Sequence, residues 1–266
     1  MRKGTVAAKL IVLTHQGQET ADADVIEEQP LSIYVNGAEL ATMMCTPVHQ
    51  EAMAVGFLLN EGLINSLDDV GVAHLCAEGT CVDIWLNVPG FKPPRRPILT
   101  SSCAGGVTFD DLTHLLPPLR YDSVRITPDR LHKLMGDLYR AAVLHPLAGG
   151  AHTSALSDCA ALLLVAEDIG RNNTLDKLHG LAAQQGIATQ GNIILTTGRV
   201  SSEMMGKARR METPLVCSRT SPTSLSVRLA KLWNITLVGY LRADSMTIYA
   251  HPERLVVEGK GESLES

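Results

Sequence analysis

The chain has 266 residues, of which 45% are hydrophobic, and a chain of this length can bury a large core in one or two domains. Its formal net charge of -5 and its aromatic content of 4% argue against a nucleic-acid-binding surface, which needs cationic groups and stacking platforms. The apolar runs are shorter than the roughly 18 residues of a membrane span, and the N-terminus is typical of a strand rather than a signal peptide. We therefore expect a cytoplasmic protein whose six cysteines are reduced thiols.

Residues 1–98 predict a β-rich N-terminal part with one helix. The Asn-Gly dipeptide at 36–37 separates two strand-like segments, LSIYV and AELATMMC, and this dipeptide suits the two-residue turn of a hairpin. A helix is predicted next, with Thr46 as its N-cap, Pro47 at its first position and Gly62 at its end.

A second hairpin is predicted from the segment VAHLCAEGTCVDIWLNV, with its turn around Ala77–Thr80. Cys76 and Cys81 flank this turn, so the two thiols can face each other across the hairpin. Two thiols without a nearby set of histidines are too few for a typical zinc site. We interpret them as core or face cysteines, and we expect no metal site in this chain.

Residues 127–266 predict an α/β domain. Thr127 can cap a helix that has Pro128 at its first position and apolar residues along one face. Strand-like and helix-like segments then alternate, in the order CAALLLVAED, NTLDKLHGLAAQQG, GNIILTT, SSEMMGKARRME, TPLVCS, SPTSLSVRLAKLWN, ITLVGYLR and MTIYAH. This alternation predicts the α/β fold class, with a mixed, largely parallel sheet on which the helices pack.

An arginine follows each of four predicted strands. These arginines are Arg171, Arg199, Arg219 and Arg242. Ligands of open α/β sheets bind outside the carboxyl ends of the strands, where helix N-termini and arginine side chains suit phosphate groups. We therefore expect an anionic ligand, a di- or polyphosphate, at this edge. The alternative is that the Ser, Thr and Asn residues of these loops are only helix caps and that the arginines are solvated surface groups.

Two aspartates lie close to the first of these loops. Asp168 and Asp176 could each bond a hydroxyl or N–H group of a ligand, or could pair with Arg171 or Lys177. Other ligand classes lack their motifs, because the sequence has neither a Walker motif nor a glycine-rich dinucleotide fingerprint after a strand. A zinc deaminase is also disfavoured, since the HTS segment at His152 lacks the glutamate that such enzymes use.

Residues 99–126 predict a mobile cysteine loop and a connector. Cys103 stands among serines, a threonine and two glycines in LTSSCAGGVTF, downstream of the proline-rich segment FKPPRRP. Positive charge and backbone N–H groups lower the pKa of a thiol and make it reactive, and Arg95 and Arg96 can supply the charge. These residues alone leave open whether Cys103 is a nucleophile or an incidental turn cysteine.

Six segments occur together in this sequence: TSSCAGG, CTPVHQEAMAVGFLLNEGLI, EDIGRNNTLDKLHG, LTTGRVSSEMMGKA, SPTSLSVRLAKLWNITLVGYLR and MTIYAHPERL. Together they resemble the formate dehydrogenase accessory sulfurtransferase family, the FdhD/NarQ type, over nearly the whole chain. The resemblance implies a cytidine-deaminase-like layered fold without the zinc, and a homodimer. It also implies a sulfur carrier that takes persulfide sulfur from a cysteine desulfurase. The sulfur goes to the molybdenum (or tungsten) bis(molybdopterin guanine dinucleotide) cofactor before its insertion into formate dehydrogenase.

Carried over by position, the resemblance makes Cys103 the persulfide cysteine. The residues expected to bind the cofactor, or GDP as its analogue, are Arg171, Asn172, Gly198, Arg199, Ser201, Arg219, Ser221, Tyr240, Leu241, Arg242, Ala243, Asp244 and Ser245. The sequence departs from the family pattern at Gly106, where a second loop cysteine is common, at Asn172, where histidine is usual, and at Thr174, where alanine is common. His152 could lie near the site or be a turn histidine with a satisfied hydrogen bond.

The function predicted from these residues is sulfur transfer with Cys103 as the nucleophile, whose thiolate attacks the terminal sulfur of the donor persulfide. The arginine-rich edge, in residues 127–266, then holds the guanine-dinucleotide phosphates of the cofactor. The alternative is a non-catalytic chaperone that binds the guanine-dinucleotide cofactor of a molybdoenzyme. The expected partners are a cysteine desulfurase, formate dehydrogenase and a second copy of the chain, without nucleic acid or membrane.

Overall fold

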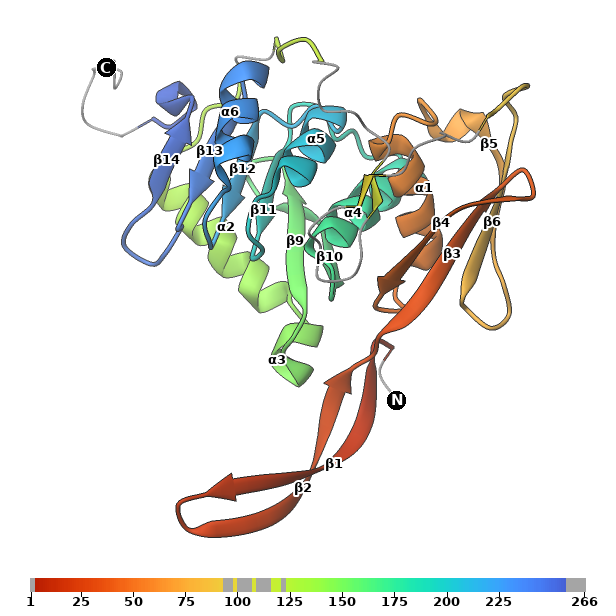
Figure 1. The fold of residues 1–266 in the computed structure, drawn as a ribbon. Coiled ribbons are helices and arrows are strands. Elements are labelled where there is room, and N and C mark those ends of the chain that lie inside the picture. Colours follow the sequence, from red (N-terminus) through yellow and green to blue (C-terminus); the bar gives the residue numbers. More distant parts are fainter. Residues whose placement is uncertain (1–2, 93–97, 100–106, 109–115, 121–122, 257–266) are drawn as a thin grey trace.

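The computed structural model describes residues 3–92, 98–99, 107–108, 116–120 and 123–256 (Figure 1). Cys103 and Gly106 lie outside these residues, as does much of the predicted cysteine loop and connector. Two short strands, β7 (Ile98–Leu99) and β8 (Val107–Thr108), pair antiparallel on either side of the Cys103 segment.

The N-terminal part begins with a hairpin of β1 (Thr5–Thr14) and β2 (Gly17–Ile26), which projects away from the rest of the molecule (Figure 1). The strand expected at the N-terminus is therefore present, and its partner β2 was not predicted. The next four strands form a sheet in the order β4-β3-β6-β5. Their bounds are β3 (Gln29–Val35), β4 (Ala38–Cys45), β5 (Val70–Leu75) and β6 (Cys81–Leu86).

Both hairpins predicted in this sheet are confirmed. Asn36 and Gly37 connect β3 and β4 with φ of 50° and 80°, the positive values that a two-residue hairpin turn of this kind requires. The pairing of β5 with β6 brings Cys76 and Cys81 opposite each other beyond the last paired residues, Leu75 and Val82. A short 3-10 helix, η1 (Leu67–Asp69), precedes β5.

The helix α1 (Gln50–Asn60) begins later than predicted. His49, with φ of 55°, occupies the N-cap position, so the expected N-cap at Thr46 is wrong. Thr46 instead bonds to the α/β domain: its N–H donates to Oδ2 of Asp168 at 3.1 Å, and its hydroxyl accepts from the N–H of Ile169 at 3.2 Å. The hydroxyl of Thr46, with which it would cap a helix, is therefore already bonded to the α/β domain. The predicted end at Gly62 is confirmed, because the α1 C-cap is Glu61 and Gly62 has φ of 67°.

The second sheet has six strands in the order β10-β9-β11-β12-β13-β14. Their bounds are β9 (His152–Ser157), β10 (Leu162–Asp168), β11 (Ile193–Thr196), β12 (Leu215–Ser218), β13 (Thr236–Gly239) and β14 (Thr247–Ala250). Only the β11–β12 and β12–β13 neighbours in this sheet are parallel. The sheet was expected to be largely parallel, but most of its neighbouring strands are antiparallel, so this expectation is wrong. One reason is the unpredicted strand β9, which lies antiparallel between β10 and β11.

Helices cover both faces of this sheet (Figure 1). The helices are α2 (Pro128–Ala141), α3 (Leu144–Ala148), α4 (Arg171–Gln185), α5 (Ser202–Arg210) and α6 (Ser224–Trp233), with a short 3-10 helix, η2 (Pro252–Arg254), after β14. On one face α2 buries Leu131, Leu134 and Leu138, and the predicted N-cap at Thr127 is confirmed. The mixed α/β class is thus established, and the cytidine-deaminase-like layering stays a prediction.

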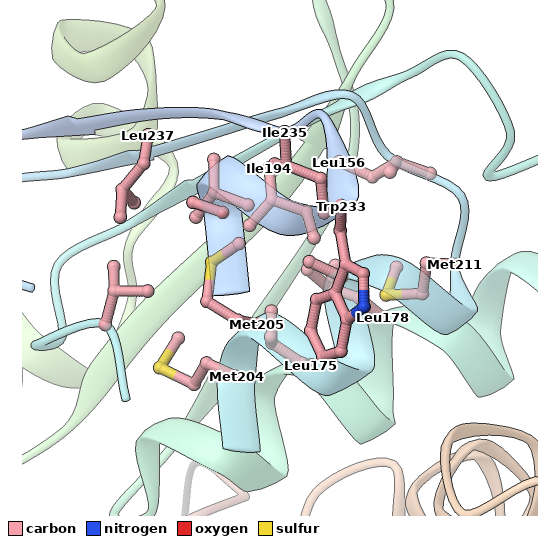
Figure 2. Close-up of a cluster of buried hydrophobic side chains, with 14 of the residues drawn as sticks. Leu156, Leu175, Leu178, Ile194, Met204, Met205, Met211, Trp233, Ile235 and Leu237 are labelled. Atoms are coloured by element: carbon pink, nitrogen blue, oxygen red, sulfur yellow. The ribbon is translucent and has the colours of Figure 1, made fainter. Parts of the chain in front are cut away.

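The larger core lies on the opposite face, between the sheet and α4, α5 and α6 (Figure 2). Leu175 of α4, Met205 of α5 and Trp233 of α6 meet Ile194 and Leu237 of the sheet, and all five are at most 1% exposed. Burial of large apolar side chains of this kind is the dominant favourable contribution to folding. This core fixes where the loops after β11, β12 and β13 emerge.

The two sheets are joined by close packing of α1 against α4. A Cβ atom at Gly56 would lie 1.8 Å from the carbonyl oxygen of Asp176, and one at Gly180 would lie 1.8 Å from that of Ala52. Both positions therefore require glycine, because real Cβ atoms do not come so close to backbone. Among the described residues, no helix is both long enough and apolar enough to cross a bilayer.

Candidate functional site

A pocket of about 670 Å³ opens where the strands of the six-stranded sheet end. The strands β11, β12 and β13 run parallel, and β10 has the same direction because β9 is antiparallel to both β10 and β11. Their carboxyl ends therefore meet at one edge, as the sequence predicted. Four predicted residues line the pocket, namely Arg219, Ser221, Tyr240 and Arg242.

The backbone at the end of β13 orients the side chains of Tyr240 and Arg242. Tyr240 has φ of 51°, a value that is rare for a bulky residue and is often found where a site constrains the backbone. The Tyr240 N–H donates to the carbonyl of Thr220 at 3.0 Å, and the N–H of Leu241 donates to that of Ser218 at 3.0 Å. The turned backbone brings the guanidinium carbon of Arg242 to 5.7 Å from the centre of the Tyr240 ring, a cation–π distance.

The end of β12 positions the second arginine. The N–H of Arg219 donates to the carbonyl of Thr196 at 3.0 Å, which ties this loop to the end of β11. The Ser218 hydroxyl donates to the carbonyl of Gly198 at 2.7 Å and accepts from the N–H of Thr220 at 3.0 Å. The loop is therefore held on both sides, and Arg219 reaches the pocket from a fixed backbone.

Arg199 and Arg171 stand apart from the pocket wall. Arg199 is exposed and Arg171 is buried, and neither is among the residues that line the pocket. Gly198 lies against Arg171: a Cβ at Gly198 would come within 2.9 Å of the Arg171 Cβ and 3.4 Å of Nδ1 of His152. Arg171 therefore lies behind the wall, next to His152, rather than at the surface of the pocket.

The other predicted binding residues divide between structural roles and an adjoining groove. Ser201 is the N-cap of α5 and accepts from the N–H of Met204 at 3.3 Å, and the amide of Asn172 donates to Glu203. Leu241 and Ala243 line a groove of about 350 Å³, which shares Tyr139, Arg219 and Arg242 with the pocket. Asp244 and Ser245 line neither; the Ser245 carbonyl accepts from the N–H of Arg242 at 2.8 Å.

Several pocket residues were missed by the sequence reasoning. These are Tyr139 on α2, His145 on α3, and Gly150, Ala151, Thr197 and Thr220 in loops. Among the pocket residues from 145 to 152, the sequence singled out only His152. The carboxylate of Glu167 holds α3 in place, because it accepts from the backbone N–H groups of Val143 at 2.7 Å and Leu144 at 2.9 Å. That contact at a helix N-terminus fixes His145 at the rim.

His152 lines the pocket, which agrees with the alternative that it lies near the site. Burial lowers its pKa below the ordinary value of 6.5, and the positive charge of Arg171 lowers it further. The imidazole is therefore neutral at pH 7 and can donate or accept a hydrogen bond. His145 also lines the pocket, and its Nδ1 lies 3.2 Å from the carbonyl oxygen of Ala151.

The wall of the pocket carries Arg219 and Arg242 and, within the described part of the chain, no carboxylate. Hydroxyl groups of Thr197, Thr220 and Ser221 surround these cations. Two guanidinium groups with hydroxyl donors suit a phosphate or another planar anion, because arginine forms bidentate, charge-assisted hydrogen bonds. The prediction of an anionic ligand at this edge is consistent with these lining residues and stays a prediction.

Asp168 and Asp176 have structural roles instead of facing the pocket. Asp168 pairs with Lys177 at 2.6 Å, as one alternative predicted, and both side chains are fully buried. Asp176 pairs with Lys207 at 2.5 Å rather than with Arg171 or Lys177. Burial opposes the charge of Lys207, but Asp176 and nearby glutamates raise its pKa overall, so we take this pair as ionised at neutral pH.

The described cysteines differ in reactivity. Burial raises the pKa of Cys45 to about 12 and that of Cys159 to about 11, and it raises that of Cys217 further, so all three are protonated at neutral pH. Cys76 and Cys81 face each other across their hairpin, as predicted. Within the described residues, His, Cys, Asp and Glu side chains form no group of three that could hold a metal ion.

Fold and pocket together define an α/β protein with a cationic pocket at the carboxyl ends of its strands. The chain belongs to the FdhD/NarQ family, whose model matches residues 26–256, and this confirms the resemblance found in the sequence. The projecting β1–β2 hairpin lies almost entirely before the matched range.

Curated relatives carry the name sulfur carrier protein FdhD. The protein from Listeria innocua serovar 6a is 32% identical over 240 residues, which cover 88% of this chain and 92% of that protein. The protein from Staphylococcus haemolyticus is 32% identical over 270 residues, covering 96% and 98%. A crystal structure of a putative formate dehydrogenase accessory protein from Desulfotalea psychrophila is similar with a TM-score of 0.81 and 25% identity, over 95% of this chain and 100% of that one.

Proposed function

We propose that this protein is a sulfur carrier in formate dehydrogenase maturation. The thiolate of Cys103 attacks the terminal sulfur of a persulfide on a cysteine desulfurase. A new S–S bond forms on Cys103, and the desulfurase cysteine leaves as a thiolate, so one sulfane sulfur changes carrier. The loaded protein then passes this sulfur to the molybdenum bis(molybdopterin guanine dinucleotide) cofactor, which is its cargo rather than a resident group.

Two kinds of observation support this proposal. Curated relatives at 32% identity over most of the chain are named sulfur carrier proteins, and the similar solved structure is titled as a formate dehydrogenase accessory protein. The chain itself contributes a cationic pocket of about 670 Å³, large enough to take a nucleotide. That pocket is the observation that carries the cargo assignment.

The pocket residues fit the guanine-dinucleotide part of the cargo in chemical type. Arg219 and Arg242 can each donate two N–H groups to phosphate oxygens, and the hydroxyls of Thr220 and Ser221 can fill the remaining acceptors. The ring of Tyr240 is 40% exposed at the rim and offers a face on which a base can stack. Neutral His152 adds a group that can discriminate by hydrogen bonding without adding charge.

The proposed partners are a cysteine desulfurase, formate dehydrogenase and a second copy of the chain, in the cytoplasm. The experiment is to incubate the protein with a desulfurase and cysteine, and to measure intact mass and GDP binding in the same preparations. Sulfur addition that disappears in Cys103→Ala, with GDP binding retained, supports the carrier. GDP binding without sulfur addition supports the alternative, a cofactor-binding chaperone.

A further inference from the structure

The turn between β5 and β6 holds two thiols whose relative position is fixed. The N–H of Cys76 donates to the carbonyl of Cys81 at 2.9 Å, and the N–H of Cys81 donates to Sγ of Cys76 at 3.0 Å. Residues in a hydrogen-bonded cross-strand position have Cα atoms about 5.5 Å apart. Disulfides bridge Cα separations of about 4.4–6.8 Å, and this range includes a cross-strand pair of this kind.

The turn is anchored from outside as well. The carbonyl of Gly79 accepts from Nε2 of Gln29 at 2.8 Å and also from Nε2 of Gln50, while the N–H of Gly79 donates to the carbonyl of Cys76 at 2.9 Å. These bonds tie the turn to β3 and to the start of α1. The backbone that carries the two thiols is therefore held in place on both sides of the turn.

The two thiols are partly exposed and chemically unequal. Both have intermediate exposure, whereas Cys45 and Cys217 are buried. Hydrogen bonding from the Cys81 side chain lowers the pKa of Cys76, while the same contact raises the pKa of Cys81 to about 11. The Cys76 sulfur is therefore the one that ionises first, and Cys81 remains a thiol beside it.

We propose that Cys76 and Cys81 form a thiol–disulfide exchange site for low-molecular-weight disulfides, separate from Cys103 and independent of the proposed carrier function. The Cys76 thiolate attacks one sulfur of the small disulfide, and a mixed disulfide forms as one small thiolate leaves. Cys81 loses its proton to solvent and attacks Sγ of Cys76, and the second small thiolate leaves. Overall, two protein thiols are oxidised to one cross-hairpin disulfide, and one small disulfide is reduced to two thiols.

The experiment uses the full-length protein with Cys103→Ser as background, so that the loop thiol does not contribute. The protein is equilibrated in buffers of reduced and oxidised glutathione, quenched with a thiol-alkylating reagent and analysed by peptide mass mapping. The expected product is a peptide pair joined through Cys76 and Cys81, with the loss of two hydrogen atoms. If both thiols remain alkylatable in the most oxidising buffer, the proposal is wrong.

Two matched variants test the assigned roles. Cys81→Ser should accumulate a glutathione adduct on Cys76, because the resolving thiol is missing. Cys76→Ser should gain its adduct on Cys81 more slowly, because Cys81 lacks the hydrogen bonds from Thr80 that help to lower the pKa of Cys76. Serine can replace the sulfur as a hydrogen-bond acceptor, so the turn should keep its structure in both variants. The disulfide test on the protein with both cysteines does not depend on either variant. Equal adduct rates in the two variants would overturn the assignment of Cys76 as nucleophile.

Discussion

The guanidinium of Arg242 lies 5.7 Å from the centre of the Tyr240 ring, and that ring is presented by a residue with φ of 51°. The pair holds a planar cation at the rim of the pocket beside Arg219. If the pocket binds the phosphates of a guanine nucleotide, removal of this cation should remove a charge-assisted contact. We expect Arg242→Ala to weaken GDP binding by about 1.5–3 kcal/mol, measured by calorimetry.

Arg199→Ala is the matched control for this measurement. Arg199 is also an exposed arginine that follows a strand of the same sheet, but it does not line the pocket. Its loss should change GDP affinity by less than about 0.5 kcal/mol, because a surface side chain outside the pocket makes no direct contact with the bound nucleotide. Equal losses of GDP affinity in the two variants would mean that the strand-end arginines attract GDP only through long-range electrostatics. The pocket would then not be the binding site.

A second prediction concerns Gly198, which leaves room for Arg171 and His152. A Cβ at this position would lie 2.9 Å from the Cβ of Arg171, which is not the flexible end of a side chain. Gly198→Ala should therefore shift the loop after β11 together with His152. We expect GDP affinity to fall roughly tenfold, about 1.4 kcal/mol, while the far-UV circular dichroism remains that of the wild type. An unchanged affinity would contradict the packing argument.

The sequence predicted the α/β domain better than its sheet. The strand β9 was missed because Thr153, Ser154 and Ser157 are polar, and polar residues in a short segment give no core pattern. All three are buried, and the hydroxyl of Ser154 lies 2.6 Å from that of Thr174 and donates to that of Thr196 at 2.8 Å. Hydrogen bonds between distant segments therefore make this central strand possible, and a local pattern cannot reveal them.

The candidate site was also predicted only in part, because local patterns do not show which distant segments come together. Arg219 and Arg242 were found because each follows an apolar strand, and that rule is local. The same rule also selected Arg199, which does not line the pocket, since a strand end does not determine where a long side chain points. Tyr139 and His145 reach the pocket from α2 and α3, and no local pattern indicates that these helices lie at that edge.

A third prediction concerns the contact between α1 and α4. A methyl group at Gly56 would lie 1.8 Å from the carbonyl oxygen of Asp176, so the two helices would have to separate. We expect Gly56→Ala to lower the free energy of unfolding by about 3 kcal/mol in urea titrations, the upper range for overpacking. Gly136→Ala on α2 is the control. Its new Cβ would meet nothing closer than 3.5 Å, so stability should be unchanged or raised by up to about 1 kcal/mol. Similar losses in both variants would contradict this explanation.

A fourth prediction concerns pH. Burial lowers the pKa of His179 from 6.5 to about 4, with a smaller contribution from Lys207. Its Nδ1 lies 2.7 Å from Oδ1 of Asn60, whose amide donates to Asp176, so neutral histidine fits as the donor. The unfolded chain takes up a proton near pH 6.5 that the folded protein does not bind until about pH 4. The free energy of unfolding should therefore fall as the pH drops through this window, by about 3 kcal/mol from His179.

The comparison that isolates this contribution is His179→Asn, which retains an N–H donor for Asn60 and does not titrate. Urea titrations at several pH values should show that the variant loses about 3 kcal/mol less than the wild type between pH 6.5 and pH 4. Parallel pH profiles for the two proteins would show that His179 does not cause the dependence.

In the proposed function, Cys103 carries sulfane sulfur while the pocket at the strand ends holds the cargo. The most direct test of this function is intact-mass and peptide mass spectrometry of the wild type and of Cys103→Ala, after incubation with a cysteine desulfurase and cysteine. We expect one added sulfur atom on the peptide that contains Cys103, no addition in the variant, and equal GDP affinity in both. Absence of sulfur on Cys103 in the wild type, or equal loading of the variant, would contradict the proposed function.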